Sequence, residues 1–309
     1  MSATAPEPTA AKQPASAPRS TGSAPVAISG AVPAVLAAPT LASRARAFAS
    51  ASLARGQVEI LQFFRSKDAV VFTLALPVVL LAMLASIFSG YVEHTSVRFS
   101  QVYTTGLLAA GLASTSFLNL AVAIATEREN GGLKRLAGTP MPRTAYFVGK
   151  AIVVLVTCSL EVAVLLVFGH FLYHVAFPST LGRWWTFIWV TLLGASDMAL
   201  LGIAVSSVPR TARSAAPVAN LPLLVLEFIS GVFVPFTALS HTLYDFAGAF
   251  PLRWVAEGYR SALLPDFFQK VEPTHRWDHG TMALVLLIWC AASLLISAKT
   301  FRWTGRGER

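Results

Sequence analysis

The chain has 309 residues, of which 55% are hydrophobic and only 13% are charged, and it carries a net charge of +9. A soluble domain contains about 25% charged residues, so this composition excludes an ordinary soluble domain and predicts a protein that faces lipid. The basic residues form no stripe interleaved with aromatic residues, which argues against nucleic-acid binding. Cys158 and Cys290 lie inside apolar runs without metal-ligand spacing, and we interpret them as small residues facing lipid or the protein core.

The amino-acid composition of the N-terminal part of the chain changes near residue 40. Residues 1–40 are dominated by Ala, Pro, Ser and Thr without a periodic apolar face, which predicts a disordered cytoplasmic tail. No uninterrupted apolar core of the kind found in a signal peptide occurs in this segment. Residues 41–68 are helix formers with arginines among them, and we expect an amphipathic helix on the membrane surface. A solvated basic linker is the alternative.

Six apolar runs follow, each close to the roughly 20 residues that a helix needs to cross a bilayer. They cover approximately residues 70–88, 102–125, 151–172, 184–206, 216–234 and 282–298. The sequence therefore predicts an all-α polytopic membrane protein whose six-helix transmembrane domain spans residues 69–309. The second run is the least apolar, and Gly106, Ala110 and Ser114 recur every four residues in it, which favours close helix packing over lipid contact.

The distribution of lysine and arginine predicts the orientation. If both termini are cytoplasmic, the cytoplasmic segments hold 18 of the 24 basic residues, as 7 + 5 + 2 + 4 along the chain. The external segments then hold the other six, together with six acidic residues. Because cytoplasmic loops carry the excess of basic residues, we expect a multi-pass protein of the inner membrane with both ends inside.

The loop of residues 126–150 is the longest predicted cytoplasmic connection and is dense in charge. Leu133 and Leu136 are three apart and share one face of a short helix, while Gly138 and Pro140 end it. A short helix lying on the membrane surface could be gripped by another protein. The alternative is an ordinary connector between two spans.

The residues of this loop resemble the signature loop of type-2 ABC transporter permeases, and most closely that of daunorubicin-exporter permeases. The resemblance rests on Glu127, Arg128, Glu129, Gly132, Leu133, Arg135, Leu136, Thr139, Pro140 and Arg143, followed by Gly149 and Lys150. It implies that these residues form a coupling helix that docks on a separate ATPase subunit.

The sequence contains no G-x-x-x-x-G-K-[ST] phosphate-binding loop. We therefore expect no cofactor on this chain and no enzymatic activity of its own. ATP and Mg²⁺ are expected on the partner ATPase.

A second special segment precedes the last span, at residues 236–265. Leu239, Leu243 and Phe246 fall on one helical face, and a second amphipathic pattern begins after Pro251. Each piece is too short to cross the membrane, so we expect two short re-entrant helices in the outer leaflet, with a water-exposed helical cap as the alternative. The resemblance to the family implies an external gate that includes Phe250, Pro251, Arg253 and Glu257.

Three carboxylates lie inside predicted spans: Glu161, Asp197 and Glu227. Burying such a group costs about 2.5–3.5 kcal/mol on insertion scales, so each must face protein, water or a partner charge. We expect Glu161 to serve packing. Asp197, Glu227, Gly231, Phe233 and Pro235 are candidates for a substrate path or a subunit interface. His170 and His174 are spaced like a metal pair but have no third ligand, and we expect no metal site.

These features together favour the permease of an ATP-binding cassette exporter that moves an amphiphilic or hydrophobic substrate, such as a drug, antibiotic or lipid, outward. We expect a second permease copy or a paralogue, an ABC ATPase subunit and membrane lipids as partners. A polysaccharide or glycolipid exporter is the first alternative. An ion-coupled secondary transporter and an intramembrane hydrolase built on Ser196 and Asp197 are weaker alternatives.

Overall fold

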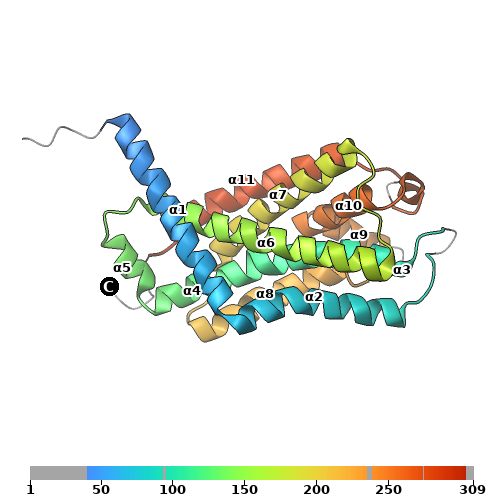
Figure 1. Cartoon of the computed structure of the whole chain (residues 1–309), viewed down its shortest axis with the longest axis horizontal. Coiled ribbons are helices and arrows are strands. Elements are labelled where there is room, and N and C mark those ends of the chain that lie inside the picture. Colours follow the sequence, from blue (N-terminus) through green and yellow to red (C-terminus); the bar gives the residue numbers. More distant parts are fainter. Residues whose placement is uncertain (1–39, 93–94, 235–238, 274, 304–309) are drawn as a thin grey trace, which may run out of the picture. The chain divides into compact units, whose positions relative to one another are not determined.

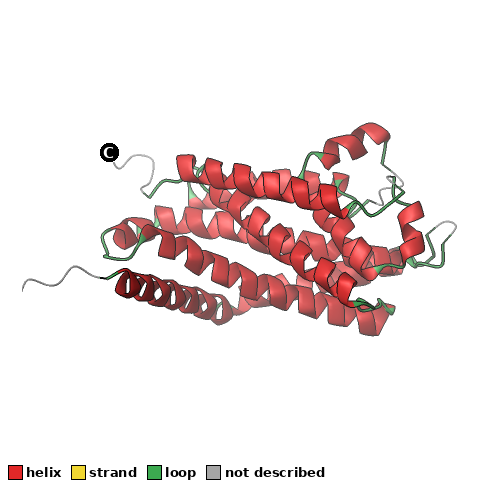
Figure 2. Ribbon diagram, turned by 90° about the horizontal axis from the view of Figure 1, so that it is seen from above, coloured by secondary structure: helices red, strands yellow, loops and turns green. Residues whose placement is uncertain are grey.

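The fold was analysed in a computed structural model of the chain, which describes residues 40–92, 95–234, 239–273 and 275–303. The part it describes is built from helices and contains no β-strand, only one isolated bridge between Tyr91 and Arg98 (Figure 2). Six helices are long and apolar enough to cross a membrane. The predicted all-α polytopic fold is confirmed.

Five of the spans are longer than the apolar runs that predicted them, whereas α8 has 18 residues and ends at Ile229, before the predicted end at residue 234. They are α2 (Lys67–Ile87), the continuous helix α3–η1–α4 (Phe99–Ala113, Ser114–Leu118 and Asn119–Glu129), α6 (Arg143–Tyr173), α7 (Leu181–Val205), α8 (Ala212–Ile229) and α11 (His279–Thr300). Side-chain caps begin three of them: Thr180 for α7, Thr211 for α8 and Asp278 for α11. Each cap accepts a backbone N–H that the first helical turn leaves without a partner.

Helix α1 (Leu41–Arg65) precedes the first span and packs against α6. Gly56 makes this approach close: a Cβ there would lie 2.9 Å from the Ile152 side chain. Gly149 does the same from the opposite side, since a Cβ would collide with Arg55. The helix expected at residues 41–68 is therefore present as a packed element, while residues 1–39 of the expected tail lie outside the described residues.

The second span forms the centre of the fold. In its most apolar stretch 72% of residues are buried, against 6% for α2 and 22% for α8 and for α11. Gly106 shows why small residues are needed, because a Cβ there would lie 2.9 Å from the backbone oxygen of Val232. The second span is thus enclosed by protein, as its small residues predicted, although α8 has the lower mean hydropathy (1.3 against 1.8).

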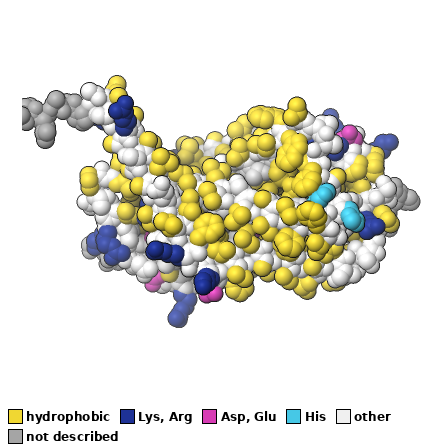
Figure 3. Space-filling model, in the orientation of Figure 1, with side chains coloured by type: hydrophobic (Ala, Val, Ile, Leu, Met, Phe, Trp, Pro, Cys, Tyr) yellow, Lys and Arg dark blue, Asp and Glu magenta, His cyan; other side chains and the backbone are white. Residues whose placement is uncertain are grey.

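The two ends of the bundle differ in their short helices. Helix α5 (Gly132–Ala137) lies at one end, which we call the α5 end (Figure 1). Helices α9 (His241–Gly248) and α10 (Pro251–Leu263) and the 3₁₀ turn η3 (Asp266–Lys270) lie toward the opposite end, the α10 end. Figure 3 shows apolar side chains over the middle of one face, with Lys and Arg toward the ends. A belt of this kind is what a bilayer requires.

Candidate functional site

The charged run Glu127–Arg128–Glu129 ends α4, and its first member is held by two other helices. The carboxylate of Glu127 accepts from Lys150 Nζ at 2.6 Å, from the Tyr146 hydroxyl at 2.8 Å and from Arg55 at 3.0 Å. Lys150, which is only 1% exposed, also contacts Glu59 at 2.8 Å. This buried ion cluster joins the end of α4 to α1 and α6. Each charge has opposite charges as neighbours, which is the condition for burying it.

The next two residues of the run bind other parts of the bundle. Arg128 donates to the backbone oxygens of Ser206 and Arg302, and its guanidinium lies 5.6 Å from the centre of the Phe301 ring. Glu129 accepts from the backbone N–H of Ala212 at the start of α8, where the positive end of the helix dipole favours an anion. The three consecutive charges therefore connect α4 to five other elements: α1, α6, the end of α7, the start of α8 and the segment after α11.

Helix α5 follows this run directly. Leu133 is fully buried, and Leu136 packs against the same core. Arg135, Thr139 and Pro140 are exposed. Gly131 has φ +68°, a left-handed conformation in which glycine is favoured, and its N–H and C=O link the two helices. The loop thus presents a short exposed helix anchored by one leucine.

Two residues at the edges of the loop complete its anchoring. A Cβ at Gly132 would lie 3.1 Å from the backbone oxygen of Glu127, so the turn from α4 to α5 is tight. Arg143, at the start of α6, is exposed and its guanidinium lies 5.5 Å from the centre of the Trp303 ring. The loop is therefore seated on the segment that follows α11.

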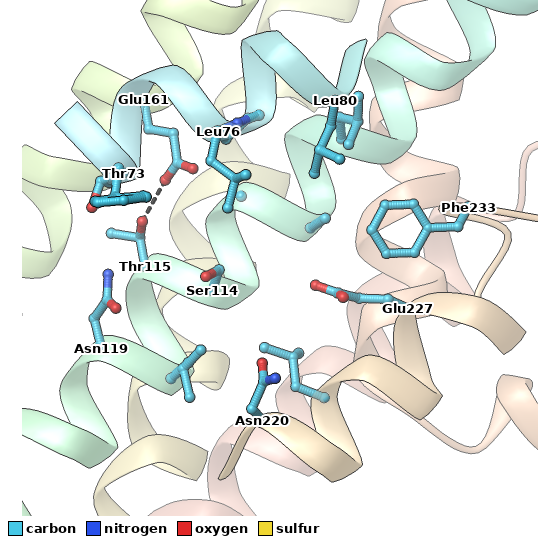
Figure 4. A pocket seen from close by; sticks show the side chains of 17 residues that line it. Thr73, Leu76, Leu80, Ser114, Thr115, Asn119, Glu161, Asn220, Glu227 and Phe233 are labelled. Carbon is cyan, nitrogen blue, oxygen red and sulfur yellow. Dashed lines mark hydrogen bonds between the residues drawn. The ribbon is translucent and has the colours of Figure 1, made fainter. Parts of the chain in front are cut away.

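Near the middle of the bundle lies a cavity of about 280 Å³, which we call the Glu227 cavity. Its walls come from α2, the second span, α6 and α8, with Phe233 after α8 (Figure 4). Apolar side chains such as Leu76 and Leu80 alternate with a few polar ones. Such a lining, mostly apolar with a small number of placed polar groups, is typical of small-molecule sites.

A π-helical turn, Ser114–Leu118, shapes one wall of the Glu227 cavity. It interrupts the second span, and Thr115 within it donates a hydrogen bond to the carboxylate of Glu161 on α6 (Figure 4). A Cβ at Gly111 would collide with the same carboxylate. Short π-helical segments occur frequently at functional sites. The sequence contains no signal for this turn. It also does not indicate which residue bonds to Glu161.

The Glu227 carboxylate points into the cavity from α8 (Figure 4). The residue is 8% exposed, and within the described part of the chain its carboxylate makes no hydrogen bond or ion pair. Phe233 lines the same cavity. Two of the residues expected on a substrate path are thus brought together.

A family model described as ABC-2 type transporter matches residues 53–264, which is more than half of the chain. The chain belongs to this family. The matched region runs from α1 to just beyond α10 and includes both the charged run and the Glu227 cavity. No significant match to a curated protein is found.

The other candidates for the permease's substrate path lie elsewhere. Asp197 on α7 is fully buried, and neither of its carboxylate oxygens has a hydrogen-bond partner among the described residues. It does not line the Glu227 cavity. Gly231 has φ +76° and makes the turn that ends α8, while Pro235 lies outside the described residues.

The permease's α10 carries the residues expected at an external gate. Pro251 begins the helix after Phe250, and all thirteen residues of α10 are buried. Arg253 donates to the backbone oxygen of Tyr244 at 3.0 Å, with its guanidinium 3.5 Å from the centre of the Tyr244 ring. Protein therefore encloses α10 on every side.

Two more charged residues of α10, Glu257 and Arg260, are also buried. Arg260 forms an ion pair of 2.6 Å with Glu272, and both side chains are almost fully buried. Glu257 is also fully buried, and its two carboxylate oxygens find no hydrogen-bond partner in the described part of the permease. Burial raises the pKa of Glu257 to about 7, with the nearby Glu272 adding to the shift. We had not selected Arg260 or Glu272 from the sequence.

The histidine pair at the end of α6 is tied to backbone structure. The Nδ1 atom of His170 lies 2.8 Å from the Val175 backbone oxygen, and His174 ends the helix with φ 54°. Across the described ranges, no group of three or more His, Cys, Asp or Glu is arranged to hold a metal ion.

Proposed function

We propose that this multi-pass membrane permease component of an ABC transporter, identified by its family and its six apolar helices, exports an amphiphilic or hydrophobic substrate, such as a drug, antibiotic or lipid. The energy would come from ATP hydrolysed on a separate subunit. The observation that carries this proposal is the charged run at the end of α4. It joins the exposed helix α5 to spans on several sides of the bundle.

Force applied to α5 would reach the spans through this run. Gly131 links α5 directly to α4, and Glu127, Arg128 and Glu129 hold α4 to its neighbours by charge-assisted bonds. A rigid connection of this kind converts a small displacement at a docking site into a change in helix packing. We therefore place the ATPase contact on the exposed residues of the loop, with Arg135 at its centre, and give the charged run the task of transmission.

In this proposal the α5 end faces the cytoplasm and the α10 end faces outward across the inner membrane. The positive-inside rule supports it, because 18 of the 24 basic residues belong to the segments expected to be cytoplasmic, among them the loop that carries α5. A second permease copy or a paralogue would cover α2 and α8, which carry large exposed apolar side chains such as Phe72, Leu76 and Leu221. The same exposure also suits lipid contact.

The cavity favours an amphiphile over a glycan. Its lining consists of five leucines, two phenylalanines, Ala110, Pro77 and Gly111, together with two carboxylates, two amides and three hydroxyl groups. A glycan chain requires many hydrogen-bonding groups along its path, so the polysaccharide exporter stays the second candidate. The daunorubicin-exporter branch, suggested by the loop residues, belongs to the amphiphile class.

The test is capture of an ATPase. The full chain is co-expressed with the P-loop ATPase subunits of its own genome, purified through a tag on the permease, and assayed for bound ATPase. We expect stable capture by the wild type and a loss of about tenfold or more for Arg135→Glu, because charge reversal at a docking surface repels its partner. Arg44→Glu, an equally exposed arginine on α1, is the matched control and should retain capture.

Two results would overturn the proposal. Absence of capture by the wild type would remove the ATPase partner, and equal loss in both variants would place the contact outside α5. Export itself is measured in proteoliposomes, where the transported amphiphile should appear on the α10 side only when ATP is present on the α5 side.

A further inference from the structure

The Glu227 cavity contains an uncommon arrangement: a carboxylate 92% buried that has no partner in the described part of the chain. We propose that this cavity binds a lipophilic organic monocation, with Glu227 as its counter-charge. The inference rests on the proposed function, since it names the substrate class of the same permease. It adds a binding site, a ligand charge and a residue that recognises it.

The charges lining the cavity select a cation. Glu161 and Glu227 are the two ionisable residues among those that line it, and no Lys, Arg or His is among them. An anion would face carboxylates in a low-dielectric setting, where repulsion is strong. A neutral ligand would leave the Glu227 carboxylate as it is, buried without an opposite charge, whereas a cation removes that cost.

The two carboxylates are not equivalent. Glu161 already accepts a hydrogen bond from Thr115 on the π-helical turn, while Glu227 has no such bond within the described residues and points into the open space (Figure 4). A single unpaired charge fits a single positive charge on the ligand. Asn119 and Asn220 supply amide groups beside it for any polar substituents.

The remaining walls select lipophilic groups. Phe72, Leu76 and Leu80 face the cavity from one side and Leu223 and Phe233 from the other. Apolar surface removed from water contributes about 25 cal/mol per Å², and the phenylalanine rings attract cations through their π faces. A small hydrated cation such as Na⁺ would gain nothing from these walls, so the ligand is an organic cation carrying apolar groups.

A second cavity gives this site an approach from the α5 end. It has a volume of about 340 Å³, and Lys150, Glu59 and Glu127 are among its lining residues, so we call it the Lys150 cavity. Thr115 and Asn119 line both cavities. The π-helical turn therefore lies between the Lys150 cavity, which has charged walls, and the Glu227 cavity. We assign the Lys150 cavity as the entry for the ligand.

The test measures equilibrium binding of radiolabelled tetraphenylphosphonium to the purified full chain in lipid nanodiscs, with empty nanodiscs subtracted. Binding of radiolabelled tetraphenylborate, similar in size but negatively charged, is measured in separate samples and reports charge selection. We expect saturable binding of the cation and no saturable binding of the anion. Glu227→Gln should raise the Kd about tenfold or more, because the counter-charge is lost in a low-dielectric site.

Asp197→Asn is the matched control, since Asp197 is a buried, unpaired carboxylate in another span that does not line the cavity. Its Kd should stay within about twofold of the wild type, as expected for a charge outside the site. Glu161→Gln should cause a smaller loss than Glu227→Gln. Monodisperse elution of each variant from a sizing column shows that it is folded.

The proposal is overturned if the wild type does not bind the cation, if tetraphenylborate measured separately binds equally well, or if Glu227→Gln binds like the wild type. An equal loss in Asp197→Asn would also overturn it, because the effect would then be general. The entry is tested by Ala123→Trp, which fills only the Lys150 cavity. It should slow association without changing Kd, and an unchanged rate would remove the entry assignment.

This experiment needs no ATPase, so its result is separate from the capture test. Binding without ATPase capture would leave a cation-binding membrane protein and defeat the proposed function. Capture without cation binding would leave the exporter and defeat the substrate class.

Discussion

Two carboxylates of this permease, Glu127 and Glu227, are both largely buried but are treated in opposite ways by the fold. Glu127 has bonds from three side chains on two other helices. Glu227 has no side-chain partner among the described residues and faces a cavity. A paired charge can hold helices together, whereas an unpaired one is retained at a cost in stability. The ion pairs of Glu127 therefore make the α5 end rigid, whereas the unpaired carboxylate of Glu227, in the middle of the bundle, is free to bind a ligand.

The largest effect on stability should come from removing Glu127, the carboxylate that has bonded partners. Glu127→Ala leaves Lys150 and Arg55 with Glu59 as their one remaining carboxylate and removes the acceptor of the Tyr146 hydroxyl. We expect a loss of about 4 kcal/mol in stability, because two largely buried cations must then share one carboxylate. Thermal unfolding of the purified protein measures it. Glu129→Ala, which removes one exposed contact, should cost under about 1 kcal/mol; equal losses would show that the cluster has no special role.

The next effect is a pH dependence at the α10 end. Burial raises the pKa of Glu257 from 4.5 to about 7, with Glu272 and Asp278 raising it further and Arg253 and Arg260 opposing them. Below about pH 4.5 the group is protonated in both folded and unfolded states. As pH rises through 7 the folded state must bury a charge, so stability falls by about 2–3 kcal/mol between pH 5 and pH 8.

Glu257→Gln should flatten this dependence. The measurement is the melting temperature of wild type and variant across that pH range in one detergent. The wild type should melt lower at pH 8 than at pH 5, and the variant should lose most of the difference. The same slope in both proteins would assign the titration to another group.

The smallest effect on stability is a gain, and it comes from a second carboxylate that has no partner. Asp197 is fully buried, and its oxygens have no partner in the part of the chain described. Replacing it with Asn keeps the size and removes the ionisable group, so we expect a gain of about 1 kcal/mol. Thermal unfolding at pH 8 reports it. A loss as large as that of Glu127→Ala would mean that Asp197 has a partner beyond the described residues.

The features that the sequence predicted correctly depend on residues close to one another in the chain. Apolar runs of about 20 residues predicted the spans, because a bilayer demands that length. Gly106 and its spaced small neighbours predicted that the second span is enclosed. The paired amphipathic patterns before α11 predicted two short helices, which the structure places at His241–Gly248 and Pro251–Leu263. The resemblance of the loop to a family, which the comparison confirmed, came from contiguous residues.

What the sequence determined by itself was therefore the class of protein, the spans and the position of its most charged loop. Only the tertiary structure decided what those charges touch. The partners of Glu127 lie 19, 23 and 72 residues away, and Thr115 lies 46 residues from Glu161, so no local pattern connects them. Helix α10 shows the same limit: nothing within its own sequence indicates that Arg260 pairs inside the protein with Glu272, which lies beyond the helix.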